Sequence, residues 1–139
     1  QRQMCIRDRN GRYTGRLRCV QEISAVTAAC MMVKTSVFKA VGGFDEELKV
    51  AFNDIDLCMK VRKYGVKIVF TPYAELYHYE SKSRGMEDTP EKQLRFSREV
   101  NCFRRKWERE LLKGDPYYNP NLTLNNTDCS LRKQEKNGD

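Results

Sequence analysis

A pair of adjacent glycines followed by closely spaced acidic residues is the feature that most constrains the fold of this chain. The sequence runs Val41-Gly-Gly-Phe-Asp-Glu-Glu47 and continues to Phe52-Asn-Asp-Ile-Asp-Leu57. Glycine tolerates the left-handed backbone that often ends a helix, so the pair should end a short helix over residues 37–41 that Thr35 or Ser36 caps. Asn53 or Asp54 should then cap an amphipathic helix that runs to about Tyr64. This pattern places carboxylates on a first helical turn, where a general base can sit.

The rest of the chain alternates between strand and helix signals. Residues 23–33 are apolar and predict a buried strand, or a strand with its approach loop. Residues 66–70 and 74–79 carry β-branched and aromatic side chains and predict two more strands. Residues 88–91 supply a cap, an early proline and a capping-box carboxylate, which predicts a long helix from about Pro90 to Leu112. Phe96, Val100, Phe103, Trp107 and Leu111 should form its apolar stripe.

Composition limits the class of protein. The chain has 139 residues, enough for one domain, and its apolar run at residues 25–33 is far shorter than the roughly 20 residues that span a bilayer. No transmembrane segment is therefore expected. The net charge of +7 would suit nucleic acid or an anionic membrane, but many of the arginines crowd the N-terminus and no nucleic-acid module accompanies them. Nucleic-acid binding is therefore not expected.

The chain divides into three segments. Residues 1–10 look doubtful or non-native, residues 11–115 carry the folded pattern, and residues 116–139 form an extended polar tail.

The acidic residues and the single histidine allow structural interpretations as well as functional ones. Asp54 and Asp56 could be a helix cap and a solvated acid. A lone histidine such as His78 is more often a surface or structural residue than a ligand. Ser81, Ser83 and Arg84 suit a solvated loop as well as a phosphate site.

The order of motifs resembles the acceptor-side half of a family 2 glycosyltransferase with the GT-A fold. The matching residues occur in the family's order and are Gly42, Gly43, Phe44, Asp45, Glu46, Asn53, Asp54, Asp56, Leu57 and Arg62. The resemblance implies an α/β fold, the C-terminal portion of a Rossmann-like GT-A domain with a long C-terminal amphipathic helix. The family's N-terminal half, with its nucleotide-binding strands and Asp-x-Asp metal motif, has no counterpart in this sequence.

The resemblance also implies residue roles. Asp54 would be the catalytic base, and Asp56 would assist acceptor binding or hold the helix start. Asp45, Glu46 and Asn53 would bind substrate, and residues 27–30 would line the acceptor pocket. His78 would be a ligand to Mg²⁺ or Mn²⁺, and Ser81, Ser83 and Arg84 would contact the donor diphosphate.

The implied activity is inverting transfer of a sugar from a nucleotide-diphosphate sugar to a hydroxyl of a glycan or a lipid-linked acceptor. It would serve polysaccharide biosynthesis in the cytoplasm or at the inner face of the membrane. Without the Asp-x-Asp half, the chain alone is expected to be inactive. The alternative is a non-catalytic basic module that binds nucleic acid, a membrane surface or a glycan.

Overall fold

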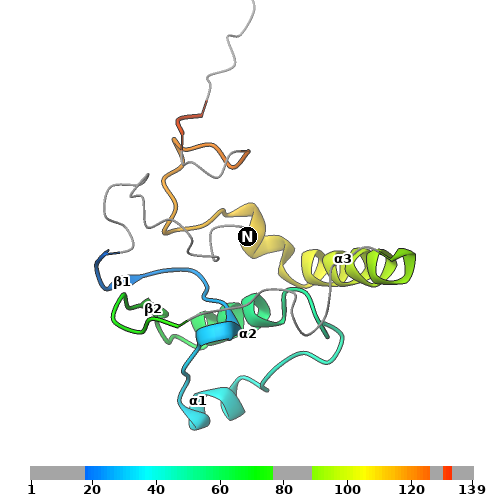
Figure 1. Ribbon diagram of the computed structural model, residues 1–139, viewed down its shortest axis with the longest axis horizontal. Coiled ribbons are helices and arrows are strands. Elements are labelled where there is room, and N and C mark those ends of the chain that lie inside the picture. Colours follow the sequence, from blue (N-terminus) through cyan, green and yellow to red (C-terminus); the bar gives the residue numbers. More distant parts are fainter. Residues whose placement is uncertain (1–17, 77–88, 126–129, 133–139) are drawn as a thin grey trace, which may run out of the picture.

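One central helix separates a small sheet from a long helix in this protein. The computed structural model describes residues 18–76, 89–125 and 130–132. Its elements are β1 (Gln21–Glu22), η3 (Ala28–Cys30), α1 (Thr35–Ala40), α2 (Asn53–Lys63), β2 (Val69–Phe70) and α3 (Pro90–Leu112). Figure 1 shows α2 at the centre, with the sheet on one side and α3 on the other.

The glycine pair ends α1 as predicted. The Gly43 amide donates to the Phe38 carbonyl at 2.9 Å and the Gly42 amide donates to the Lys39 carbonyl at 3.1 Å. Both glycines have positive φ, 79° at Gly42 and 63° at Gly43. The two hydrogen bonds satisfy carbonyls that the end of a helix leaves without partners. The predicted cap was wrong, because α1 starts at Thr35 and its N-cap, Lys34, makes no side-chain cap bond.

The sheet is smaller than the sequence predicted. Strands β1 and β2 pair antiparallel, with Gln21 opposite Phe70 and Glu22 opposite Val69. The predicted strand at residues 23–33 was wrong, since the chain leaves the sheet after residue 23 and turns into η3, where the Thr27 hydroxyl accepts from the Ala29 amide. The apolar residues after β1 pack on α2 instead of pairing with a strand. In the predicted strand at 74–79, residues 74–76 are irregular and the others lie outside the described residues.

Helix α3 has the predicted bounds. The Thr89 hydroxyl accepts from the Lys92 amide and Pro90 occupies the first turn, as an N-terminal cap requires. The apolar stripe is only partly buried, because Phe103 and Trp107 are covered whereas Phe96 and Leu111 are 43% and 46% exposed. A non-helical backbone at Trp107, with φ −115° and ψ 21°, interrupts the helix near its end.

Two apolar clusters hold α2 from opposite sides. The first joins Leu57, Cys58 and Val61 of α2 to Ile68 before β2. The second joins Leu48 to Phe103 and Trp107 of α3, with Ile55 and Met59 of α2 packed against it. Each buried aliphatic or aromatic side chain contributes about 1.5–3 kcal/mol, so the position of α2 is fixed by both layers.

The chain after α3 folds back on β1. The Tyr117 hydroxyl donates to Glu22 at 3.0 Å, and Ser24 donates to Asp115. Leu122 is buried and forms an isolated bridge with Leu131. The described part of the predicted extended tail therefore makes tertiary contacts. Among the helices of the described segments, none combines the length and the apolar character needed to cross a membrane.

The glycine pair supplies a matched test of this turn. A Cβ on Gly43 would lie 3.0 Å from the Phe38 ring, whereas one on Gly42 would meet nothing within 4 Å. Gly42→Ala should lower the free energy of unfolding by about 1 kcal/mol from backbone strain alone. Gly43→Ala should cost more because it adds the clash. Urea unfolding followed by circular dichroism measures both, and equal losses would show that the Phe38 contact has no role.

Candidate active site

Asp54 lies on the first turn of α2 with its carboxylate held by backbone amides. Its Oδ2 accepts from the Ala28 amide at 3.2 Å and its Oδ1 accepts from the Ile55 amide at 2.8 Å. The side chain is partly exposed. The two amide donors fix the direction of the carboxylate at the first turn of the helix. The carboxylate is thus oriented, and it borders residues 27–30, which were predicted to line the acceptor pocket.

The residue before this turn has an unusual backbone. Phe52 is the N-cap of α2 and has φ 65°, in the left-handed region; it is the sole non-glycine residue with positive φ in the described ranges. A bulky residue rarely adopts this conformation, which costs on the order of 1–3 kcal/mol. Asn53 and Asp54 are therefore the first helical residues and not the predicted caps. The Asn53 side chain accepts from the Asp54 amide at 2.7 Å.

Helix α3 holds that strained turn in place. The Phe52 ring stacks on Phe103 with centroids 5.1 Å apart and lies 5.9 Å from Phe96. The Ala51 amide donates to Glu99 at 2.6 Å, and Glu99 is only 3% exposed. These contacts come from three turns of α3, and they fix the residues directly before Asp54.

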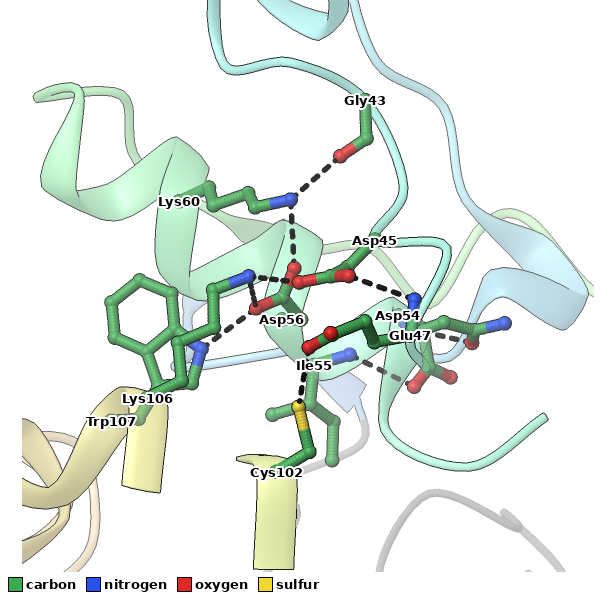
Figure 2. A network of polar contacts seen from close by, with 11 residues as sticks. Gly43, Asp45, Glu47, Asp54, Ile55, Asp56, Lys60, Cys102, Lys106 and Trp107 are labelled. Carbon is green, nitrogen blue, oxygen red and sulfur yellow. Dashed lines mark hydrogen bonds and ion pairs between the residues drawn. The ribbon is translucent and has the colours of Figure 1, made fainter. Parts of the chain in front are cut away.

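Asp56 is the centre of a buried polar network (Figure 2). Its side chain is 0% exposed; the Trp107 indole donates to Oδ1 at 2.8 Å, and the Lys106 ammonium lies 2.7 Å from the same oxygen. The Lys60 ammonium lies 2.9 Å from Oδ2, an ion-pair distance, although its angle falls outside normal hydrogen-bond geometry. The interpretation of Asp56 as a solvated acid was therefore wrong, because the side chain is buried and joins α2 to α3. Its predicted role in acceptor binding stays a prediction.

The same network reaches the loop after the glycine pair. Lys106 contacts Asp45, and Lys60 donates to the Gly43 carbonyl at 3.0 Å. Asp45 also accepts from the Glu47 amide at 2.9 Å. The hydrogen bond from Lys106, and then the one from Glu47, hold the pKa of the Asp45 carboxyl below its usual value. Burial disfavours the charged Lys106, but its bonds to Asp45 and Asp56 outweigh burial and raise the pKa of that ammonium.

Two thiols lie near this region without forming a reactive site. The Cys102 thiol donates to Glu47 at 3.2 Å, and this bond, with burial, raises its pKa. Burial likewise raises the pKa of the Cys58 thiol, which contacts the Val26 backbone. A raised pKa keeps a cysteine in its weakly nucleophilic thiol form.

Several predicted site residues lie elsewhere. Glu46 is exposed on the loop after the glycine pair. His78, Ser81, Ser83 and Arg84 fall outside the described residues, so their predicted roles stay predictions. Among residues 18–76, 89–125 and 130–132, no three His, Cys, Asp or Glu side chains gather in a way that could hold a metal ion.

Sequence reasoning missed the residues that support Asp54 from α3. Glu99, Lys106 and Trp107 were interpreted as part of an amphipathic helix. Glu99 and Lys106 give no local signal of a buried partner, since each contacts residues 48 to 61 positions earlier in the chain. The one available hint was Glu99, a carboxylate next to Val100 of the predicted apolar stripe, because a buried acid needs a partner.

Comparison with known proteins identifies related sequences. The profile of the family described as "Glycosyltransferase like family 2" matches residues 7–100. A protein of Sinorhizobium fredii, "Uncharacterized protein y4gI", is 57% identical over 120 residues, which are 86% of this chain and 13% of that protein. The O-antigen biosynthesis protein RfbC of Myxococcus xanthus is 39% identical over 115 residues, 83% of this chain and 9% of that protein.

A third relative matches a shorter stretch. The N-acetylglucosaminyl-diphospho-decaprenol L-rhamnosyltransferase of Mycobacterium tuberculosis is 36% identical over 62 residues, 45% of this chain and 20% of that enzyme. This chain thus spans a fifth or less of the length of these relatives. No solved structure matches it.

The indole hydrogen bond to Asp56 can be tested by one substitution. Trp107→Phe keeps a ring but removes the donor from a buried carboxylate, and such a bond contributes about 1.5–3 kcal/mol. The free energy of unfolding should fall by about 1.5–3 kcal/mol in urea titrations followed by circular dichroism. Tyr73→Phe, at an aromatic side chain that is 85% exposed, is the control and should change little. A small loss for Trp107→Phe would remove this bond from the stabilising network.

Acid should weaken the fold partly through Asp45. Because the folded state lowers the pKa of this carboxyl, its contribution is fully present above the unfolded pKa of about 3.9 and is lost as pH falls through the lower folded value. The drop in unfolding free energy between about pH 5 and about pH 3 should therefore be smaller in Asp45→Asn than in the parent. Glu46→Gln, at the exposed neighbour, is the control, and an unchanged drop in Asp45→Asn would contradict the assignment.

Proposed function

The chain belongs to glycosyltransferase family 2, and from this membership we propose that it carries the acceptor-side part of an inverting glycosyltransferase with Asp54 as general base. The donor is a nucleotide-diphosphate sugar and the acceptor is a hydroxyl of a glycan or lipid-linked saccharide. Two relatives support this class of substrate, since one is named for O-antigen biosynthesis and the other as a rhamnosyltransferase acting on a diphospho-decaprenol.

The observation that carries the assignment is the different surroundings of three neighbouring carboxylates. Asp56 is fully buried and paired with two lysines, and Asp45 is paired with Lys106. Asp54 contacts backbone amides through its two oxygens and remains partly exposed. A general base needs an ionised oxygen that an incoming hydroxyl can reach, and Asp54 fits that requirement better than the other two.

In the proposed reaction the acceptor oxygen attacks the anomeric carbon as the bond to the diphosphate breaks. The acceptor proton passes to the Asp54 carboxylate, and the nucleoside diphosphate leaves on the opposite face, so the configuration at the anomeric carbon inverts. The Ala28 and Ile55 amides hold the carboxylate in one orientation. Such positioning keeps the base within hydrogen-bond reach of a bound hydroxyl.

A divalent cation, Mg²⁺ or Mn²⁺, belongs to the proposal through the family resemblance alone. It would stabilise the leaving diphosphate, with His78 as a ligand. Ser81, Ser83 and Arg84 would add contacts to that diphosphate. The alternative of a basic binding module rests on the net charge of +7.

Substitution of Asp54 in an intact homologue tests the proposal. Asp54→Asn keeps the size of the side chain and an oxygen for the backbone amides but removes the basic group. The initial rate of sugar transfer, measured with labelled nucleotide-diphosphate sugars and acceptor in excess, should fall by about a hundred- to ten-thousand-fold. The free energy of unfolding should change by less than about 1 kcal/mol.

Glu22→Gln is the matched control, because it removes a carboxylate that is already paired with Lys67 and has no predicted role in the site. It should leave most of the transfer rate unchanged. Full activity in Asp54→Asn would exclude Asp54 as the base.

A further inference from the structure

A shallow hollow of about 350 Å³ lies at the C-terminal end of α2, away from Asp54. Its lining comes from the end of α1, from α2 and from α3: Val41, Lys60, Lys63, Tyr64, Lys106 and Trp107. Asp54 lies on the first turn of α2 and Lys63 is its last residue, roughly 13 Å apart along the helix axis at 1.5 Å per residue. The hollow shares Lys60, Lys106 and Trp107 with the Asp56 network, and Asp54 is not among its lining residues.

Two of the three lysines of the hollow keep donor capacity after their pairing. An ammonium has three N–H donors. Lys60 contacts Asp56 and the Gly43 carbonyl, and Lys106 contacts Asp45 and Asp56. The positive charges of these two lysines are thus balanced by the negative charges of Asp45 and Asp56. Each lysine makes two contacts, so one of its three N–H donors is left.

Lys63 adds a positive charge that neither Asp45 nor Asp56 neutralises. It is exposed and forms no ion pair within the described part of the chain. Its ammonium lies 5.8 Å from the centre of the Trp107 ring, and the Lys106 ammonium lies 5.9 Å from the same ring. Two like charges therefore reach one indole, and an anion between them would relieve their repulsion.

We propose that this hollow binds a phosphate-type oxyanion, such as the phosphate or diphosphate group of a larger molecule. Ammonium groups bind phosphate as point charges. Three lysines line this hollow, and the charge of Lys63 is not balanced by the two carboxylates that pair with Lys60 and Lys106. The volume is in the lower part of the range for small-ligand sites, and Val41 and Tyr64 add a partly apolar wall for the group that carries the phosphate. The proposal goes beyond sugar transfer at Asp54 and does not depend on it.

Trp107 provides a direct reporter, because it is the single tryptophan of the chain. Inorganic pyrophosphate is titrated into the protein at constant ionic strength while the indole fluorescence is recorded. Binding should give a saturable change in emission. Lys63→Gln should weaken it by about tenfold, the effect of losing one charged hydrogen bond of about 1.5 kcal/mol.

Lys49→Gln is the matched control, since Lys49 is also exposed but does not line the hollow. It should bind like the parent. The far-UV circular dichroism spectrum and the urea unfolding midpoint of Lys63→Gln should match those of the parent, which shows that the fold is intact. The proposal is overturned if neither pyrophosphate nor phosphatidic acid vesicles give a saturable response, or if the parent and Lys63→Gln respond equally.

A second arm separates a soluble phosphate from a lipid headgroup. Vesicles containing phosphatidic acid are compared with vesicles of phosphatidylcholine alone. A response to pyrophosphate that Lys63→Gln weakens supports a soluble phosphate compound. A response to the anionic vesicles alone, again weakened by Lys63→Gln and not by Lys49→Gln, supports a headgroup; a response to both kinds of vesicle would overturn phosphate recognition.

Discussion

The buried carboxylate of Asp56 is the constraint on which the rest of this structure depends. Removing an ionised carboxylate from water costs several kcal/mol, and a paired cation repays this only with good geometry. Here Lys60, Lys106 and Trp107 converge on the two oxygens. Lys106 and Trp107 come from α3 and Asp56 lies on α2. These contacts therefore fix how the two helices pack against each other. Lys60 and Lys106 extend these contacts to Gly43 and Asp45, which places the loop after α1 on the same network.

This constraint bears on chemistry because Asp54 lies two residues before Asp56 on the same turn. Once α2 is fixed against α3, the strained Phe52 can be stabilised by its stacking on Phe103. The bond from Ala51 to Glu99 holds the same segment from the side. The cost of the left-handed backbone is thus offset by contacts that a long helix supplies from a distant part of the sequence. The orientation of the proposed base depends on α3, although α3 donates no bond to it.

Local signals explain which parts of the fold could be predicted from the sequence. The bounds of α3, the end of α2 and the glycine turn follow from caps, glycines and helical periodicity, which act over a few residues. The predicted strand at residues 23–33 failed because an apolar run does not show whether its partners are strands or a helix face. The left-handed Phe52 and the partners that α3 supplies to Asp56 could not be predicted, since both depend on side chains about fifty residues later. Asp54 was singled out through the family pattern, and its backbone contacts became visible only in the folded chain.

The two ends of α2 differ in their electrostatics, and this difference follows from its sequence. The first turn carries Asp54 and Asp56, and the last turn carries Lys60, Arg62 and Lys63. Each charge opposes the helix dipole at its own end, which stabilises the helix by roughly 0.3–1 kcal/mol per favourable charge. The same arrangement places the proposed base at one end and the unbalanced ammonium of Lys63 at the other. A helix built in this way can present a proposed proton acceptor and a proposed anion site on one rigid element, with the buried Asp56 lying between Asp54 and Lys60 along the helix.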